Sequence, residues 1–139
     1  MEKNQLIEQK IAHLTFIQGV INRMGQNSFL LKGWSITVVA ALFALAAQGA
    51  NKQFVLIAYF PAFMFWVLDG YFLYQERLFR KLYEKVSCNE IPSDTFTLNI
   101  SSVRNEVGGY GSAALSRTLL LFHGCVIAVL LFAMFGILI

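Results

Sequence analysis

Three long apolar segments constrain this chain more than any other feature. They comprise residues 29–47, 54–74 and 118–139. Each is close to the roughly 20 apolar residues that cross a hydrocarbon core of about 30 Å. Of all residues, 57% are hydrophobic and only 14% are charged, a balance too apolar for a soluble domain of 139 residues. The sequence therefore predicts an all-α membrane protein with three transmembrane helices.

The basic residues are unevenly distributed between the connections. Four lie before or at the start of the first span, one lies in the short 48–53 hairpin, and six lie in the 75–117 segment. Because cytoplasmic loops carry an excess of Lys and Arg, we expect the N-terminus and the 75–117 segment in the cytoplasm of a bacterial cell. The hairpin and the C-terminus would then face the periplasm, across the inner membrane.

Residues 1–28 predict an amphipathic cytoplasmic helix ahead of the first span. Its apolar side chains recur at steps of three and four residues: Ile7, Ile11, Leu14, Ile17, Ile21 and Met24. The opposite face is mostly uncharged and contains Glu8, Thr15, Gly19, Asn22 and Gln26. One interpretation is a face in contact with water or with the membrane surface. The other is a wet vestibule in an oligomer, in which Thr15, Asn22 and Gln26 line an ion path.

The second span is predicted to continue into the cytoplasm as one helix to about Val86, because its apolar rhythm persists without a Gly or Pro. Farther along, residues 95–100 alternate between polar and apolar, which predicts a short strand. A lone strand of six residues needs a partner from another segment or another subunit. A homo-oligomer, with a tetramer favoured, would cover the strand and place the polar face of the first helix around an axis.

Two ionisable side chains lie inside the predicted spans, where they are costly unless they face a bundle interior or water. We expect Asp69 to pair with Lys32, Arg77 or a hydroxyl group. The alternative is that Asp69 belongs to a polar ring that lines a pore mouth. His123 is predicted to donate a hydrogen bond to a neighbouring helix, the alternative being that it senses pH.

The sequence predicts neither an enzyme nor a metal site. Acid–base chemistry needs a base within hydrogen-bond reach of its partner, and His13 and His123 lie on different predicted helices. Cys88 and Cys125 form no ligand pair for a metal. We therefore expect no catalytic residue, no metal and no cofactor.

A basic cluster follows the second span directly, at Arg77, Arg80, Lys81 and Lys85. Basic residues next to a membrane commonly bind anionic lipid, at about 1 kcal/mol each. The alternative is that symmetry repeats the cluster around a chamber whose cations bind the phosphates of a single-stranded oligonucleotide, while aromatic rings stack on its bases. The candidate ligand-binding residues are Arg77, Arg80, Lys81, Lys85, Arg104, Phe79, Tyr83 and Tyr110.

Three stretches show a family resemblance: INRMGQNSFLLKGWSITVVAALFALAA (21–47), AYFPAFMFWVLDGYFLYQERLFRKLYEKV (58–86) and LSRTLLLFHG (115–124). Together they resemble the transmembrane effectors of the Hailong anti-phage defence system, and the 87–112 segment departs from that pattern. The resemblance implies a homo-oligomeric ion channel that depolarises the inner membrane and arrests or kills the infected cell. It also implies that a short single-stranded DNA oligomer, made by a companion nucleotidyltransferase, holds the channel closed.

Two other functions stay open on the residues alone. One is a non-conducting membrane anchor that recruits a soluble partner through the 87–112 loop. The other is holin-like membrane disruption, which would release large molecules as well as ions. Conductance measurements on the purified protein would separate these functions from a selective channel.

Overall fold

The chain forms five helical elements and, over the residues that the structure describes, no β-strand. The computed structural model describes residues 2–49 and 52–138. The elements are α1 (Glu2–Gly49), α2 (Lys52–Ser87), the 3-10 helix η1 (Ser101–Glu106), α3 (Tyr110–Ala114) and α4 (Arg117–Leu138). The predicted all-α class is confirmed.

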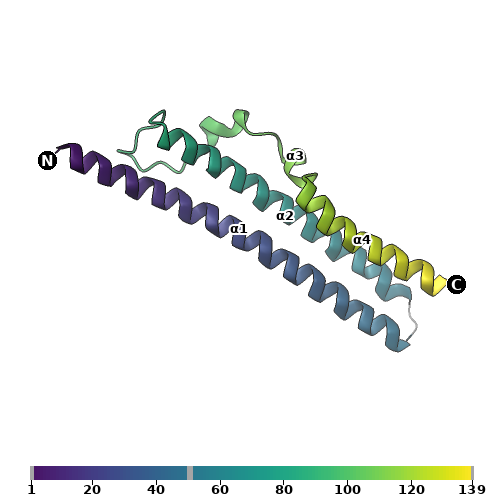
Figure 1. The fold of residues 1–139 in the computed structure, drawn as a ribbon. Coiled ribbons are helices and arrows are strands. Elements are labelled where there is room, and N and C mark those ends of the chain that lie inside the picture. The colour runs from purple at the N-terminus through teal and green to yellow at the C-terminus, as the bar shows by residue number, and fades with distance from the viewer. Residues whose placement is uncertain (1, 50–51, 139) are drawn as a thin grey trace.

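α1 and α2 form a long antiparallel hairpin, and α4 lies along the first half of α2 (Figure 1). At 1.5 Å per residue, the 48 residues of α1 and the 36 of α2 are about 72 and 54 Å long, and the 22 residues of α4 are about 33 Å long. α4 therefore matches the hydrocarbon thickness, whereas α1 and α2 extend well beyond it.

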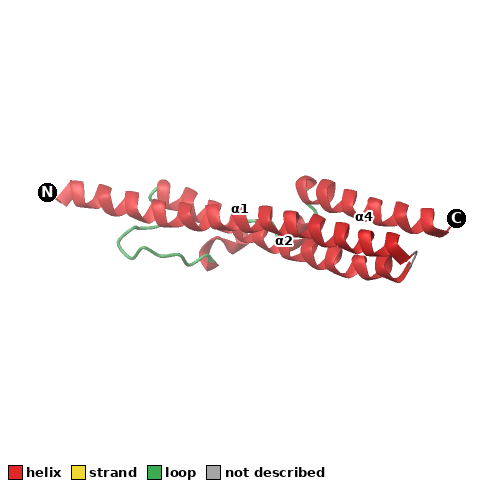
Figure 2. Cartoon of the chain, turned by 90° about the horizontal axis from the view of Figure 1, so that it is seen from below, coloured by secondary structure: helices red, strands yellow, loops and turns green. Residues whose placement is uncertain are grey.

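α1 and α2 continue past the level at which α4 begins. We call this part of the chain, residues 2–28 and 75–116, the stalk. The remaining described residues, 29–49, 52–74 and 117–138, form the membrane bundle. Figure 2 shows the connection from α2 to α3 beside the stalk part of the hairpin. The stalk is therefore two helices covered by a loop, and the bundle is three helices.

Three described helices are long and apolar enough to cross a membrane, over Lys3–Gln48, Gln53–Ser87 and Arg117–Phe135. The first two contain the predicted spans 29–47 and 54–74, and the third covers residues 118–135 of the predicted span 118–139. α2 ends at Ser87, so the predicted helical extension to about Val86 is confirmed. Residues 1, 50, 51 and 139 of the predicted segments lie outside the described residues.

The predicted N-terminal helix and the first span are one helix in the structure. α1 passes through the expected boundary at residues 28 and 29 without a break. Its glycines near that point, Gly25 and Gly33, are isolated, and a helix tolerates an isolated glycine at a cost of about 1 kcal/mol. The stalk and the bundle are therefore joined rigidly through α1.

Two separate apolar cores stabilise the hairpin. The stalk core consists of Ile17, Ile21, Leu78, Leu82, Val86 and Val103. The bundle core consists of Val39, Ala58, Ala62 and Leu130. In the stalk, each fully buried aliphatic side chain contributes about 1.5 to 3 kcal/mol relative to an exposed one. In the bundle, small residues let the helix backbones approach closely, which is how helices pack in lipid.

The buried face of α1 differs from the predicted one at its beginning. Ile7 and Ile11 are 50% and 59% exposed, whereas His13 and Ile17 are fully buried. Buried and half-buried residues then follow at steps of three and four: His13, Ile17, Ile21, Met24, Ser28, Lys32, Ser35, Val39, Leu42 and Ala46. α1 therefore presents one continuous face to the rest of the chain, from the stalk into the bundle.

The predicted strand at residues 95–100 is wrong. That segment is an irregular loop in which side chains satisfy the backbone: Asn99 N–H donates to Thr97 Oγ1 at 3.2 Å, and Ser101 N–H donates to Asn99 Oδ1 at 2.9 Å. Phe96 has a φ of 47°, which no extended strand contains. Short polar side chains offered the backbone local partners in place of a sheet ladder.

α2 ends in a Schellman motif that α1 supports. Asn89 N–H donates to Val86 O at 3.1 Å, and the next N–H donates to Lys85 O at 2.9 Å. The φ of Asn89 is 62°, the left-handed conformation that this motif requires. Lys10 of α1 donates to Ser87 O at 2.6 Å and to Asn89 Oδ1 at 2.9 Å. A cation thus lies at the negative end of the α2 dipole.

Candidate functional site

A buried ionic network lies where α1, α2 and α4 meet. At its centre is Asp69 of α2, whose side chain is fully buried. Lys32 Nζ of α1 lies 2.6 Å from Asp69 Oδ2, and His123 Nε2 of α4 lies 2.9 Å from the same oxygen. Ser28 Oγ of α1 donates to the other oxygen, Oδ1. We call these four residues the polar node.

Helical spacing explains how α1 supplies two of the four residues. Ser28 and Lys32 are four residues apart and share one face of the helix, where Lys32 Nζ also donates to Ser28 Oγ at 2.8 Å. The predicted pairing of Asp69 with Lys32 and a hydroxyl is confirmed, while Arg77 instead donates to Ser112 Oγ at 3.3 Å. The carboxylate is therefore bound on both oxygens, as a buried charge requires.

His123 makes the predicted hydrogen bond to a neighbouring helix. Its Nε2 donates to Asp69, because an ionised carboxylate can only accept. The Trp66 ring is stacked on the imidazole, with ring centroids 5.9 Å apart and an interplanar angle of 5°. Phe122 meets the imidazole edge-on, at 5.0 Å between centroids. These rings confine His123 so that its Nε2 faces the carboxylate.

α3 packs on α2 next to the polar node and fixes where α4 begins. Trp66 Nε1 donates to Ala114 O at 2.9 Å, and Tyr110 Oη donates to Val67 O at 2.8 Å. At Gly70, an added Cβ would lie 3.0 Å from Ala114 Cβ and 3.2 Å from Tyr110 Oη. A side chain at Gly70 would therefore push α3 away. The connection through α3 is what brings α4 to the polar node.

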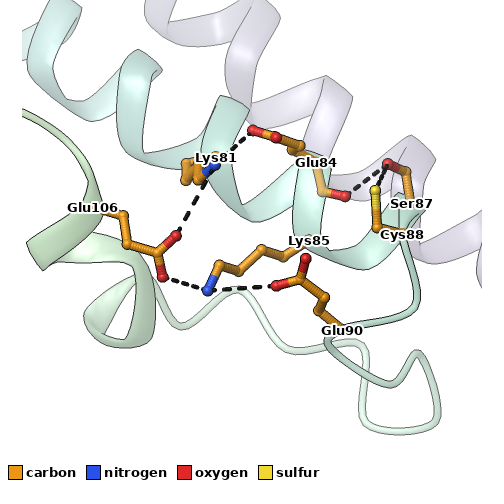
Figure 3. Close-up of polar contacts among 7 residues, drawn as sticks. All are labelled: Lys81, Glu84, Lys85, Ser87, Cys88, Glu90 and Glu106. Carbon is orange, nitrogen blue, oxygen red and sulfur yellow. Dashed lines mark hydrogen bonds and ion pairs between the residues drawn. The ribbon is translucent and has the colours of Figure 1, made fainter.

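The lysines of the predicted basic cluster are paired with carboxylates in the stalk (Figure 3). Lys81 Nζ lies 2.9 Å from Glu84 Oε2 and 4.0 Å from Glu106 Oε2. Lys85 Nζ donates to Glu106 Oε1. The hydrogen bond to Glu84 raises the pKa of Lys81, and the hydrogen bond to Glu106 raises the pKa of Lys85. Both lysines therefore stay charged, and both share one carboxylate of η1.

The arginines of the cluster are less uniformly paired. Arg80 Nη2 lies 2.7 Å from Glu76 Oε1. Arg104 of η1 is exposed, and Arg77 is bound to a hydroxyl rather than to a carboxylate. Between residues 75 and 117, six basic residues accompany five acidic ones, so the local field is weaker than the cluster alone suggests. Exposed ion pairs are worth about 0 to 1 kcal/mol, so a polyanion can displace them.

Of the aromatic side chains predicted to bind bases, two lie within the stalk, and the third, Tyr110, lies at its boundary and contacts Val67 at the edge of the membrane bundle. Phe79 and Tyr83 are half-buried and pack against the stalk core. Tyr110 is 38% exposed, and its ring lies edge-on to Tyr74 with centroids 6.4 Å apart. All three rings therefore already contribute to folding, and only part of each is open to a ligand.

The residues of α1 predicted to line a pore are exposed and share one face. Thr15, Asn22 and Gln26 fall within an arc of about 40° when 100° is advanced per residue. Asp69, predicted with them, lies in the polar node. The face continues through the bundle as exposed Gly33, Thr37, Ala40, Ala44 and Gln48. We call these eight α1 residues the outer face. A groove of about 480 Å³ lies beside its stalk end, at Thr15 and Asn22.

Sequence reasoning missed the role of His13. Its Nε2 donates to Thr97 O at 2.8 Å, which bonds the loop after α2 to α1. The available signal was spacing, because His13, Ile17 and Ile21 are four residues apart and lie on the same buried face. A histidine in register with two buried isoleucines is expected to be buried as well.

Comparison of the chain with protein-family models, with curated proteins and with solved structures gives no match. Within residues 2–49 and 52–138, no group of three or more side chains suited to a metal ion comes together. A proposal about function therefore depends on the sequence and on three features of the structure: the polar node, the paired stalk cations and the outer face.

Proposed function

We propose that this protein is a bacterial inner-membrane effector that assembles into a homo-oligomeric ion channel and depolarises the membrane. The proposal rests on the outer face, which runs from Thr15 to Gln48 along one unbroken helix and is exposed in the single chain. Uncharged polar and small side chains at this spacing suit an ion path lined by one helix from each subunit. Cyclic symmetry would bring these faces together around an axis, and we propose a tetramer.

The outer face is interrupted once, by Phe29 and Leu30 at the junction of stalk and bundle. These side chains are 77% and 56% exposed. At 100° per residue they flank the line that joins Gln26 to Gly33. Apolar side chains that surround a constriction close a pore by excluding water. In the proposed channel, Phe29 and Leu30 form the gate.

Replacing Phe29 by serine is expected to increase ion conduction severalfold, because a hydroxyl keeps the constriction wet. The combined change Asn22→Leu and Gln26→Leu is expected to reduce conduction, because leucine side chains would exclude water from the ion path on the stalk side of the gate. The measurement is ion flux from liposomes that contain the purified protein. Phe132→Ser is the matched control, since Phe132 is 80% exposed but lies on α4.

The first experiment in cells is membrane potential, read with a voltage-sensitive dye during expression of the protein. Depolarisation supports the channel, and a normal potential together with ion-tight liposomes would contradict it. Release of large dyes along with ions would instead indicate holin-like disruption. A protein that inserts, conducts nothing and captures a soluble partner through the 87–112 loop would be an anchor.

We propose further that a short single-stranded DNA oligomer, made by a companion nucleotidyltransferase, holds the channel closed at the stalk. The support is the family resemblance together with the exposed Arg80 and Arg104, and the weak ion pairs around Lys81 and Lys85. Phosphates would compete with Glu106 for the two lysines, since that carboxylate contacts both. Binding of the DNA oligomer would thus require the ion pairs between Glu106 and the two lysines to break.

Glu106→Gln is therefore expected to strengthen binding of a short DNA oligomer, while Arg104→Glu is expected to weaken it. The affinity should also fall steeply as salt rises, because bound phosphates release counterions. Fluorescence anisotropy with labelled oligomers on detergent-solubilised protein measures both effects. If Arg77→Glu and Lys81→Glu impair membrane insertion and leave the anisotropy unchanged, the cluster binds lipid headgroups instead.

A further inference from the structure

An open groove of about 750 Å³ runs between α1 and α4 in the membrane bundle. Its volume lies in the range of about 300 to 1,000 Å³ that is typical of ligand sites. Apolar side chains and one thiol form most of its wall, including Ile36, Ala40 and Phe43 of α1 and Leu121, Cys125 and Val129 of α4. We call it the acyl groove.

One end of the acyl groove is basic. Arg117, the first residue of α4, lines it and is exposed. Because α4 matches the hydrocarbon thickness, its first residue lies at the level of the lipid headgroups. Among the described residues, none forms an ion pair with Arg117. The first turn of a long helix also offers unpaired N–H groups and a positive dipole to an anion.

A second cation lies near this end of the groove. Lys32 Nζ is 5.9 Å from the centroid of the Phe122 ring, and Phe122 is part of the groove wall. Lys32 is already bound to Asp69, so its charge is largely balanced. Arg117 therefore provides the direct contact for an anion, and Lys32 adds only a weaker field.

We propose that the acyl groove binds one anionic phospholipid, with an acyl chain along α1 and α4 and its phosphate on Arg117. Charge complementarity favours a lipid over a helix from a second copy. Asp69 is the only acidic residue in the sequence between Glu8 and Glu76, and none follows Glu106. Asp69 is buried and paired, and the Glu76 side chain is only 15% exposed and is bound to Arg80, so a second copy offers Arg117 no free carboxylate near this depth.

This inference requires the three spans and does not require ion conduction. Basic pockets between membrane helices are known to bind anionic headgroups, so the chemistry is that of a lipid phosphate rather than of a free nucleotide. The acyl groove is also separate from the stalk cations proposed to bind the oligomer. A failure of either proposal leaves the other standing.

The test is native mass spectrometry of the purified chain titrated with phosphatidylglycerol or with phosphatidylcholine of the same acyl composition. Phosphatidylglycerol is expected to bind more tightly, and Arg117→Gln is expected to reduce its affinity about tenfold by removing one charge-assisted contact. Arg23→Gln, at an exposed arginine of the stalk, is the matched control and should change nothing. Equal binding of the two lipids, or equal effects of the two variants, would overturn the proposal.

The native cysteines supply a second measurement that does not depend on a variant. Cys125 lines the groove, while Cys88 is exposed in the stalk. Saturation with phosphatidylglycerol is expected to slow the reaction of Cys125 with N-ethylmaleimide and to leave Cys88 unaffected. Val129→Trp, which fills the groove from α4 and lies outside the outer face, should remove that protection. If Val129→Trp instead dissociates the oligomer and leaves lipid binding intact, the groove holds a second copy and the proposal is wrong.

Discussion

Asp69→Ala is expected to lower the free energy of unfolding by about 3 to 5 kcal/mol, the cost typical of removing one partner of a buried ion pair. The substitution leaves the Lys32 ammonium without its carboxylate and removes the acceptor of His123 and Ser28. All three helices of the bundle lose a contact at the same point. The measurement is denaturant unfolding in micelles, followed by circular dichroism.

A double variant separates the lost charge balance from the lost packing. Lys32→Met with Asp69→Asn removes both charges; the amide oxygen can accept from His123 Nε2, and the amide N–H can donate to Ser28 Oγ. Replacing a buried ion pair by neutral groups is often nearly neutral for stability, so most of the loss should be recovered. A loss below about 1 kcal/mol for Asp69→Ala would contradict the network. Conductance that changes while stability is unchanged would support Asp69 at a pore mouth.

Gly70→Leu is expected to destabilise the bundle by about 1 to 3 kcal/mol, the usual cost of overpacking. An added Cβ at Gly70 already lies only 3.0 Å from Ala114 Cβ, and the rest of a leucine has no space toward α3. The displaced α3 would carry the start of α4 with it and draw His123 away from Asp69. Unfolding in micelles measures the first effect, and the fluorescence of Trp66, which is bonded to Ala114, reports the second.

Gly124→Leu is the matched control for this prediction. Gly124 also lies in a membrane helix, and nothing lies within 4 Å of an added Cβ there. Both substitutions improve helix propensity equally, so the difference between them isolates the contact with α3. Equal stability of the two variants would show that α3 is not held against Gly70.

The membrane part of the fold was predictable because a transmembrane helix is recognised from one continuous stretch of sequence. Long apolar runs need no partner to be recognised as spans, and Asp69 inside such a run required a donor. Lys32 was a candidate because it is the only basic residue in the first span. Ser28 and Trp66 were not named, because their contacts depend on how α1, α2 and α4 are packed.

The stalk was predicted less well because its contacts are long-range. Residues 95–100 alternate like a strand, yet Thr97 O accepts from His13, which is 84 positions away in the sequence. The basic cluster is plain in the sequence, but the approach of Glu106 to Lys81 and Lys85 depends on where η1 lies. The cations and their local partners Glu76 and Glu84 follow from helical spacing, whereas Glu106 becomes a partner of both lysines only through the tertiary structure.

The unbroken α1 gives the molecule the mechanics of a lever. The polar node holds it at Lys32, roughly 45 Å from the tip at Glu2 and roughly 26 Å from the opposite end at Gly49, at 1.5 Å per residue. If α1 tilts about that pivot, a sideways displacement of the tip appears at the far end in the opposite direction and at about 0.6 of its size. A molecule that tilted α1 from the stalk would thereby act on the bundle without touching it.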